Sequence, residues 1–193
     1  MRQAWIDANI VLRHLTQEPP DQARQVSALL RSAQEGRVVL WIDPVTIAEC
    51  VWVLASVYHV PRGEIAGALA DFVAADGIGS EDREMLVQAL SVYAANNVDF
   101  ADALLASRMA QRGISDVFSF DRDFDRLPYV VRHDPGEVQS ASEVGRSTHH
   151  PQGAAPYDPQ RHRSEPASRT LRAHRFGAAQ RKQPSGVLPV GAA

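Results

Sequence analysis

Trp5-Ile6-Asp7-Ala8-Asn9-Ile10-Val11-Leu12-Arg13-His14-Leu15 is the stretch that decides the fold of this 193-residue chain. A short apolar run leads to the carboxylate of Asp7, and apolar residues at helical spacing follow it. The pattern predicts a buried strand over residues 3–6 and a helix over residues 9–15. Functional groups in open α/β sheets collect at the carboxyl ends of strands. Asp7 is therefore a candidate ligand of a Mg²⁺-type ion, and the alternative is a simple helix N-cap.

The same alternation of strand and helix continues to about residue 138. Apolar runs of strand length are followed by amphipathic segments, which implies parallel strands with right-handed crossovers. We therefore expect an α/β fold, a helix-rich three-layer α/β/α sandwich on a small parallel sheet. The further strands are expected at residues 38–42, 117–120 and 129–131, with a turn or very short strand at 77–79, and the further helices at 21–35, 44–58, 61–75, 80–94 and 99–111.

Charge and composition divide the chain near residue 138. Residues 1–138 contain 12 arginines and 20 acidic residues, a net charge of −8, whereas residues 139–193 contain 8 basic and 3 acidic residues, a net charge of +5. The second segment is rich in Pro, Gly, Ser, His and Arg and shows no apolar periodicity, which is typical of disorder. We expect one folded domain over residues 1–138 and a disordered basic tail over 139–193.

Several classes of protein are excluded by simple features. A single cysteine, Cys50, allows no intramolecular disulfide and fits a reducing cytoplasm. No basic region followed by a long apolar run opens the chain, so a secretory signal is not expected. No window approaches the roughly 18 apolar residues of a membrane span. A cytoplasmic protein without membrane contact is therefore expected.

Three acids in predicted helices are candidates for the same site as Asp7. Glu49 falls in an apolar helix, and the sequence predicts that it is buried and needs a partner, a proton or a metal. A salt bridge to an arginine of a neighbouring helix is the alternative. Asp99 and Asp102 share one face at the start of a helix among small residues, which leaves room for a metal and its waters. Favourable placement in the helix dipole is the alternative for this pair.

The last acids follow the strand expected at residues 117–120. Asp121 comes directly after it, whereas Asp123 and Asp125 fit a solvated turn, since no Gly or distal Glu completes a calcium-binding loop. Clustered carboxylates repel one another unless a divalent cation neutralises them. Ligation by oxygen alone points to Mg²⁺ or Mn²⁺, and no Cys/His set with ligand spacing favours Zn²⁺.

Four segments in this order and separation resemble PIN-domain ribonucleases, most closely the VapC-type toxins of prokaryotic toxin–antitoxin modules. The segments are residues 6–13, 48–54, 99–106 and 118–124 (IDANIVLR, AECVWVL, DFADALLA and FSFDRDF). The resemblance covers about residues 1–135, which is the whole part of the chain expected to fold.

The resemblance implies a Mg²⁺- or Mn²⁺-dependent endoribonuclease that is held inactive by a cognate antitoxin protein and forms a homodimer. In this sequence the family's catalytic acids fall on Asp7, Glu49, Asp102 and Asp121, with Asp99 as an accessory residue. The hypothesis is that Asp7, Asp102 and Asp121 hold the metal, that Glu49 and Asp99 bind outer waters or a second ion, and that Glu49 accepts a proton from the attacking water. Asn9 and Ser119 are candidates for positioning that water.

Other functions stay open at this point. A PIN nuclease of RNA processing and a catalytically silent PIN-like binding module share the same motifs. A haloacid-dehalogenase-like phosphatase also places an Asp at a strand end, but it usually has a second Asp where this chain has Asn9.

Contacts to RNA and to a protein partner are also open. The acidic body is unusual for an RNA enzyme, and Arg13, Arg112 and Arg122 are the candidates for phosphate contacts, with solvated surface arginines as the alternative. Four apolar residues of the predicted helical hairpin could receive an antitoxin segment or could be core: Trp52, Leu54, Val57 and Tyr58.

Overall fold

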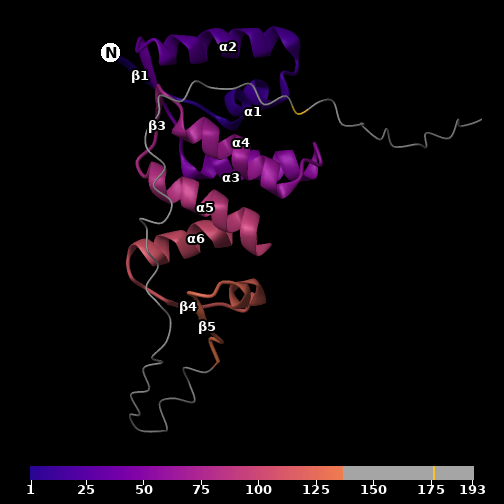
Figure 1. Cartoon of the computed structure of the whole chain (residues 1–193), viewed down its shortest axis with the longest axis vertical. Coiled ribbons are helices and arrows are strands. Elements are labelled where there is room, and N and C mark those ends of the chain that lie inside the picture. The colour runs from indigo at the N-terminus through magenta and orange to yellow at the C-terminus, as the bar shows by residue number, and fades with distance from the viewer. Residues whose placement is uncertain (137–175, 177–193) are drawn as a thin grey trace, which may run out of the picture.

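A computed structural model describes residues 1–136 and Phe176 of the chain. In Figure 1, α2 lies at one end of the molecule and the β4–β5 pair at the other, with the remaining helices stacked between them. In chain order the elements are β1 (Arg2–Trp5), α1 (Ala8–Thr16), α2 (Pro20–Gln34), β2 (Val38–Trp41), α3 (Pro44–Ser56), α4 (Arg62–Ala74), β3 (Ile78–Gly79), α5 (Arg83–Asn96), α6 (Phe100–Gln111), β4 (Asp116–Phe118), a 3₁₀ helix η1 (Arg122–Arg126) and β5 (Val131–His133).

The strands are short and all their pairings are parallel, as predicted. β1 pairs with β2 from Arg2 opposite Val38 to Trp5 opposite Trp41, and β3 adds to the other edge of β2. β4 pairs only with β5, in a second sheet. The predicted helix-rich α/β class with small parallel sheets is confirmed, although the described strands form two sheets where one was expected.

The β4–β5 pair is anchored to the helices by the segment between its two strands. The segment between them places Phe124 and Leu127 in the hydrophobic core, where these side chains are 3% and 1% exposed. The core itself is formed largely by the buried faces of the helices, for example Leu69 and Phe72 of α4 and Leu86 and Leu90 of α5. Burial of these two apolar anchors holds the β4–β5 pair against the helices, and the three residues of β4 offer only a short edge to any other strand.

Aspartate caps set the starts of several helices. Asp43 accepts a hydrogen bond from the Val45 amide (2.7 Å), and Pro44 is the first residue of α3, as the sequence predicts. The expected start of α5 at residue 80 is wrong by three residues, because the Asp82 side chain accepts from the Met85 amide (3.0 Å) and makes Asp82 the N-cap.

Two glycines make the third strand possible. Gly77 has a left-handed backbone with φ +81°, and a Cβ on it would lie 2.5 Å from the carbonyl of Ala33 in α2. A Cβ on Gly79 would lie 2.9 Å from the indole ring of Trp41. The chain therefore turns beneath α2 and brings β3 against β2 only with glycine at these positions.

The helices that the structure describes include none with both the length and the apolar character needed to cross a membrane. The predicted disordered tail at residues 139–193 lies outside the described residues, apart from Phe176. Phe176 is half-buried against the core, and its amide donates a hydrogen bond to the Leu15 carbonyl (3.4 Å).

We expect Gly77→Ala to destabilise the protein by about 2–4 kcal/mol, because the new Cβ meets backbone atoms and the residue has positive φ. The matched control is Gly67→Ala in α4, where nothing lies within 4 Å of an added Cβ. This control should stabilise the helix by up to about 1 kcal/mol. Urea unfolding monitored by circular dichroism measures both changes, and equal midpoints for the two variants would contradict the close contact at Gly77.

Candidate active site

Asp7 is the N-cap of α1, which the sequence offered as the alternative to a metal ligand. Its Oδ1 accepts from the Ile10 amide (3.2 Å) and caps α1, and its Oδ2 accepts from Nδ2 of Asn9 (3.2 Å). Asn9 therefore orients the Asp7 carboxylate. The side chain is exposed, and a carboxylate offers about four lone-pair sites, so two hydrogen bonds leave room for a cation.

The prediction that Glu49 is buried is wrong. The buried face of α3 consists of Ile47, Cys50, Val51 and Leu54, and Glu49 lies on the exposed side of the helix. No salt bridge joins Glu49 to an arginine within residues 1–136. Its carboxylate is therefore available to a ligand at the protein surface, and the apolar composition of α3 around it explains why the sequence suggested burial.

Cys50 links Asp7 to Glu49 in space. The thiol is buried, and its Sγ lies 3.9 Å from the Ala8 carbonyl, at the junction of β1 and α1. Burial raises the pKa of Cys50 to about 12, and the negative charges of Glu49 and then Asp7 contribute to the rise. Asp7 and Glu49 thus lie close enough to the same thiol for both to act on it electrostatically.

Asp102 is the centre of a second group of acids. It lies half-buried in the first turn of α6. Burial raises the pKa of Asp102, and the carboxylates of Asp121, Asp99 and Asp123 raise it further, in that order. The carboxylates of Asp99, Asp121 and Asp123 therefore lie close enough to Asp102 to act on it electrostatically.

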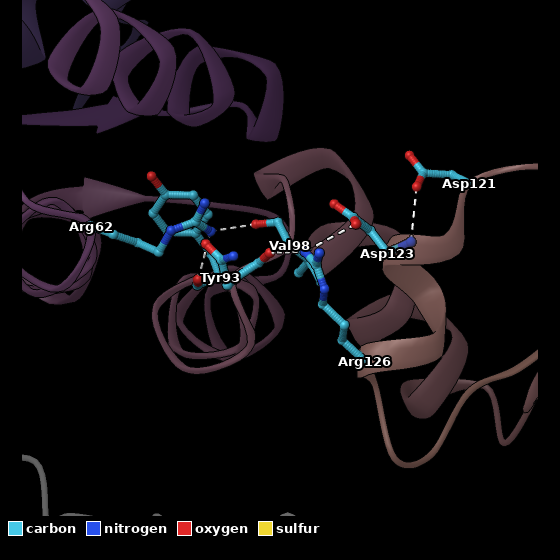
Figure 2. A network of polar contacts seen from close by, with 7 residues as sticks. Arg62, Tyr93, Val98, Asp121, Asp123 and Arg126 are labelled. Carbon is cyan, nitrogen blue, oxygen red and sulfur yellow. Dashed lines mark hydrogen bonds and ion pairs between the residues drawn. The ribbon is translucent and has the colours of Figure 1, made fainter.

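The acids after β4 form a short helical turn. Asp121 accepts from the Asp123 amide (2.9 Å) and caps η1, and its own amide donates to Oγ of Ser119 (3.0 Å), so Ser119 shapes this turn. Asp123 forms an ion pair with Arg126 (3.0 Å), as Figure 2 shows. Asp125 also forms an ion pair, which agrees with the prediction of a turn and not of a calcium-binding loop. Asp121 is the member of the segment without an ion pair in the described part of the chain.

Two arginines that the sequence analysis did not single out hold the turn before Asp99. Arg62 of α4 donates to the carbonyls of Tyr93 (2.9 Å) and Val98, and Arg126 of η1 donates to the Asn97 carbonyl (2.7 Å). Figure 2 shows the contacts of Arg62 with Tyr93 and Val98, and beside them the ion pair between Arg126 and Asp123. Asp99 is the N-cap residue of α6 but makes no side-chain cap hydrogen bond, so the turn presents its carboxylate to the site.

Asp7 and Glu49 thus act on the same thiol, and Asp121, Asp99 and Asp123 act on Asp102. Over residues 1–136 and Phe176, no three His, Cys, Asp or Glu side chains are arranged so that they could hold a metal ion. The donor chemistry still fits a hard divalent cation, because the group around Asp102 is purely carboxylate and only Asp123 has a cationic partner there. The carboxylates around Asp102 suit such an ion, although the described residues do not arrange three ligands around one point.

A comparison with protein families matches the PIN domain over residues 4–129, which includes every candidate acid. No curated protein and no solved structure matches the chain.

We expect Asp102→Asn to raise the melting temperature at pH 7 in the absence of divalent cations. The native pKa of Asp102 is raised, so the native state binds more protons than the unfolded state between the usual pKa near 4 and the raised value. The stabilising effect of a protonated Asp102 is therefore complete at low pH and is lost as the pH rises through the raised pKa.

Thermal unfolding at pH 3 and pH 7 checks this prediction, and the advantage of Asp102→Asn should disappear at pH 3. Asp21→Asn on the exposed surface of α2 is the control and should show no such gain. Addition of Mg²⁺ should raise the melting temperature of the native sequence more than it raises that of Asp102→Asn. Destabilisation by Asp102→Asn at pH 7 without metal would contradict the repulsion around this carboxylate.

Proposed function

Because the chain belongs to the PIN domain family, whose members are generally nucleases, we propose that it is a metal-dependent endoribonuclease that acts as the toxin of a toxin–antitoxin system. The observation that supports this most is the group of carboxylates around Asp102, which repel one another as they stand. A divalent cation bound among these carboxylates would offset much of the repulsion and could also bind an RNA phosphate.

The proposed roles follow from the surroundings of each acid. Asp102, Asp121 and Asp99 would hold a Mg²⁺ or Mn²⁺ ion, which when bound supplies positive charge opposite the scissile phosphate and makes a water more acidic. Asn9 holds Asp7 in one orientation, and Glu49 is exposed and able to accept a proton on its carboxylate. Asp7 is proposed as a further ligand of this ion, as the family resemblance implies.

The arginines differ in their availability to RNA. Arg13, one of the candidates, donates to Gln22 (2.8 Å) and is held within the α1–α2 pair. Arg112 and Arg122 are exposed and have no ion pair in the described part of the chain. These two are the better candidates for contacts with phosphate groups.

One face of α3 supports the proposal of an antitoxin partner. Val45 and Trp52 are 74% and 66% exposed, and Glu49 lies between them on the same helical face. Leu54 by contrast is buried, so of the residues considered for a groove this one belongs to the core. An apolar segment that covered Val45 and Trp52 would also cover Glu49, which would couple antitoxin binding to loss of activity. A homodimer is proposed on the family resemblance alone.

We expect Asp7→Asn to lower kcat/KM for cleavage of single-stranded RNA at least ~100-fold, since loss of groups that only support a ligand already costs 10–100-fold. Asn preserves the helix cap, so the melting temperature should change little. The assay compares the native sequence, Asp7→Asn and the surface control Asp21→Asn with Mg²⁺, with Mn²⁺ and with EDTA. Cleavage by Asp7→Asn at the native rate, or full activity in EDTA, would refute the assignment.

We expect induction of the native sequence in a bacterial host to arrest growth, and induction of Asp7→Asn or Asp102→Asn not to do so. Co-expression of the neighbouring open reading frame should relieve the arrest and allow its product to co-purify with the chain. Trp52→Ser should weaken that co-purification at least ~10-fold, because it removes a large exposed apolar side chain from the proposed interface. Growth without arrest, together with cleavage of RNA in vitro, would favour a nuclease of RNA processing.

A further inference from the structure

We propose that a cavity beside the carboxyl end of the first sheet binds one nucleotide of single-stranded RNA, with its base on Trp5 and its phosphate between Arg108 and Arg112. The cavity has a volume of about 310 Å³ and lies between the ends of β1, β2 and β3, the start of α5 and the end of α6. This volume is within the range of small-molecule sites. The inference rests on the proposed function, since it names where the RNA substrate of the nuclease would be held.

An aromatic shelf forms one side of this cavity. In the parallel register, Trp41 of β2 lies opposite Trp5 of β1 and opposite Gly79 of β3. The two indole side chains therefore point to the same face of the sheet, and Gly79 leaves that face open beside them. The ring of Trp41 covers Gly79, and its Nε1 donates to Gln3 (3.0 Å), which holds the indole in place. The two indole centroids are 6.0 Å apart.

Trp5 is the exposed member of this shelf. Its side chain is 60% exposed beside the fixed ring of Trp41, although a large apolar ring normally gains from burial. A preformed aromatic surface of this kind suits the stacking of an unpaired base, which is worth about 1–3 kcal/mol per base. Bases in a duplex are already stacked on both faces, so the shelf selects a single strand.

Two arginines also line the cavity. Arg108 and Arg112 are four residues apart, at the end of α6 and at its C-cap, and therefore share a face. Both line the cavity and are exposed. Neither guanidinium has a hydrogen bond or ion pair in the described part of the chain, in contrast with Arg62, Arg126 and Arg132. A pair of available guanidinium groups is the donor set that a phosphate prefers.

Some polar groups of the cavity already have hydrogen-bond partners, and others are available to a ligand. The Asp43 carboxylate caps α3, and the Asp82 carboxylate accepts from Met85 and from Gln111 (2.6 Å). Glu81 remains exposed and would repel a phosphate, which leaves the arginine side for the anion. Oγ of Ser80 lines the cavity, is buried and has no hydrogen-bond partner in the described structure. Such an oxygen is costly to bury, so a polar group of a ligand would satisfy it.

The position of the shelf connects it to the candidate active site. Trp5 precedes Asp7 by two residues, and two residues of chain span at most about 7 Å. A strand whose base lies on Trp5 would therefore pass beside Asp7. The cavity would hold a nucleotide next to the scissile bond and would position it without taking part in the chemistry.

The test measures binding separately from cleavage. A fluorescently labelled seven-nucleotide RNA is titrated in EDTA with Asp7→Asn protein, which binds but is not expected to cleave, and with further variants in this background. We expect Trp5→Leu to weaken binding about 5- to 150-fold, and Trp5→Phe to retain most of the affinity because the ring is kept. The double change Arg108→Gln and Arg112→Gln should weaken binding and lower the slope of log K against log salt by about 0.7, as expected for the loss of one neutralised phosphate on a single strand.

Arg31→Gln is the matched control for the arginine pair, because it removes an exposed arginine of α2 and should leave affinity unchanged. Unchanged affinity in Trp5→Leu and in the double arginine variant would overturn the inference, as would equal binding of double-stranded RNA. Both results would leave the nuclease function intact, since that function is judged by cleavage in Mg²⁺. If Trp5→Leu fails to fold, as circular dichroism would show, the double arginine variant and the comparison with double-stranded RNA still decide the outcome.

Discussion

The guanidinium of Arg62 is the interaction on which the arrangement of the helices depends. It extends from the first turn of α4, donates to the last turn of α5 at Tyr93, and donates again to Val98 just before α6. It also lies 4.1 Å from the centre of the Tyr93 ring, so the cation is paired with a π-system as well as with carbonyls. One side chain thus joins three helices and fixes the turn from which Asp99 and Asp102 project. The shape of the candidate site therefore depends on the contacts of Arg62, which lie outside the site.

Much of the local structure can be read from the sequence, because it depends on neighbours in the chain. The Asp43-Pro44 start of α3, the helix after Asp7 and the helix after Asp99 follow from capping and periodicity. Glu49 was misplaced because apolar residues surround it in sequence, whereas its own position on the helix faces solvent. The roles of Arg62 and Arg126 leave no local signal, since their partners are backbone carbonyls of residues 29 to 36 positions away. Long-range hydrogen bonds of this kind can be identified only once the fold is known.

The grouping of the acids could be predicted from the sequence only in part. Asp99 and Asp102 share the start of α6, so their proximity follows from helical spacing. Asp121 and Asp123 add to the effect of burial in raising the pKa of Asp102, and their nearness depends on how the segment after β4 packs on the core through Phe124 and Leu127. The identity of the acids could therefore be predicted, whereas their long-range placement could not.

The buried thiol of Cys50 has a practical consequence. With its pKa raised to about 12 and no exposed surface, it is almost wholly protonated at neutral pH and is inert to alkylating reagents while the fold is closed. Its sulfur touches the backbone at Ala8, so α3 must separate from the start of α1 before a reagent can reach it. The rate of labelling then measures how often α3 separates from the start of α1, and with these helices Glu49 from Asp7. The chain contains no second cysteine to confuse the signal, and a dye can be attached at an introduced surface cysteine without removing the native one.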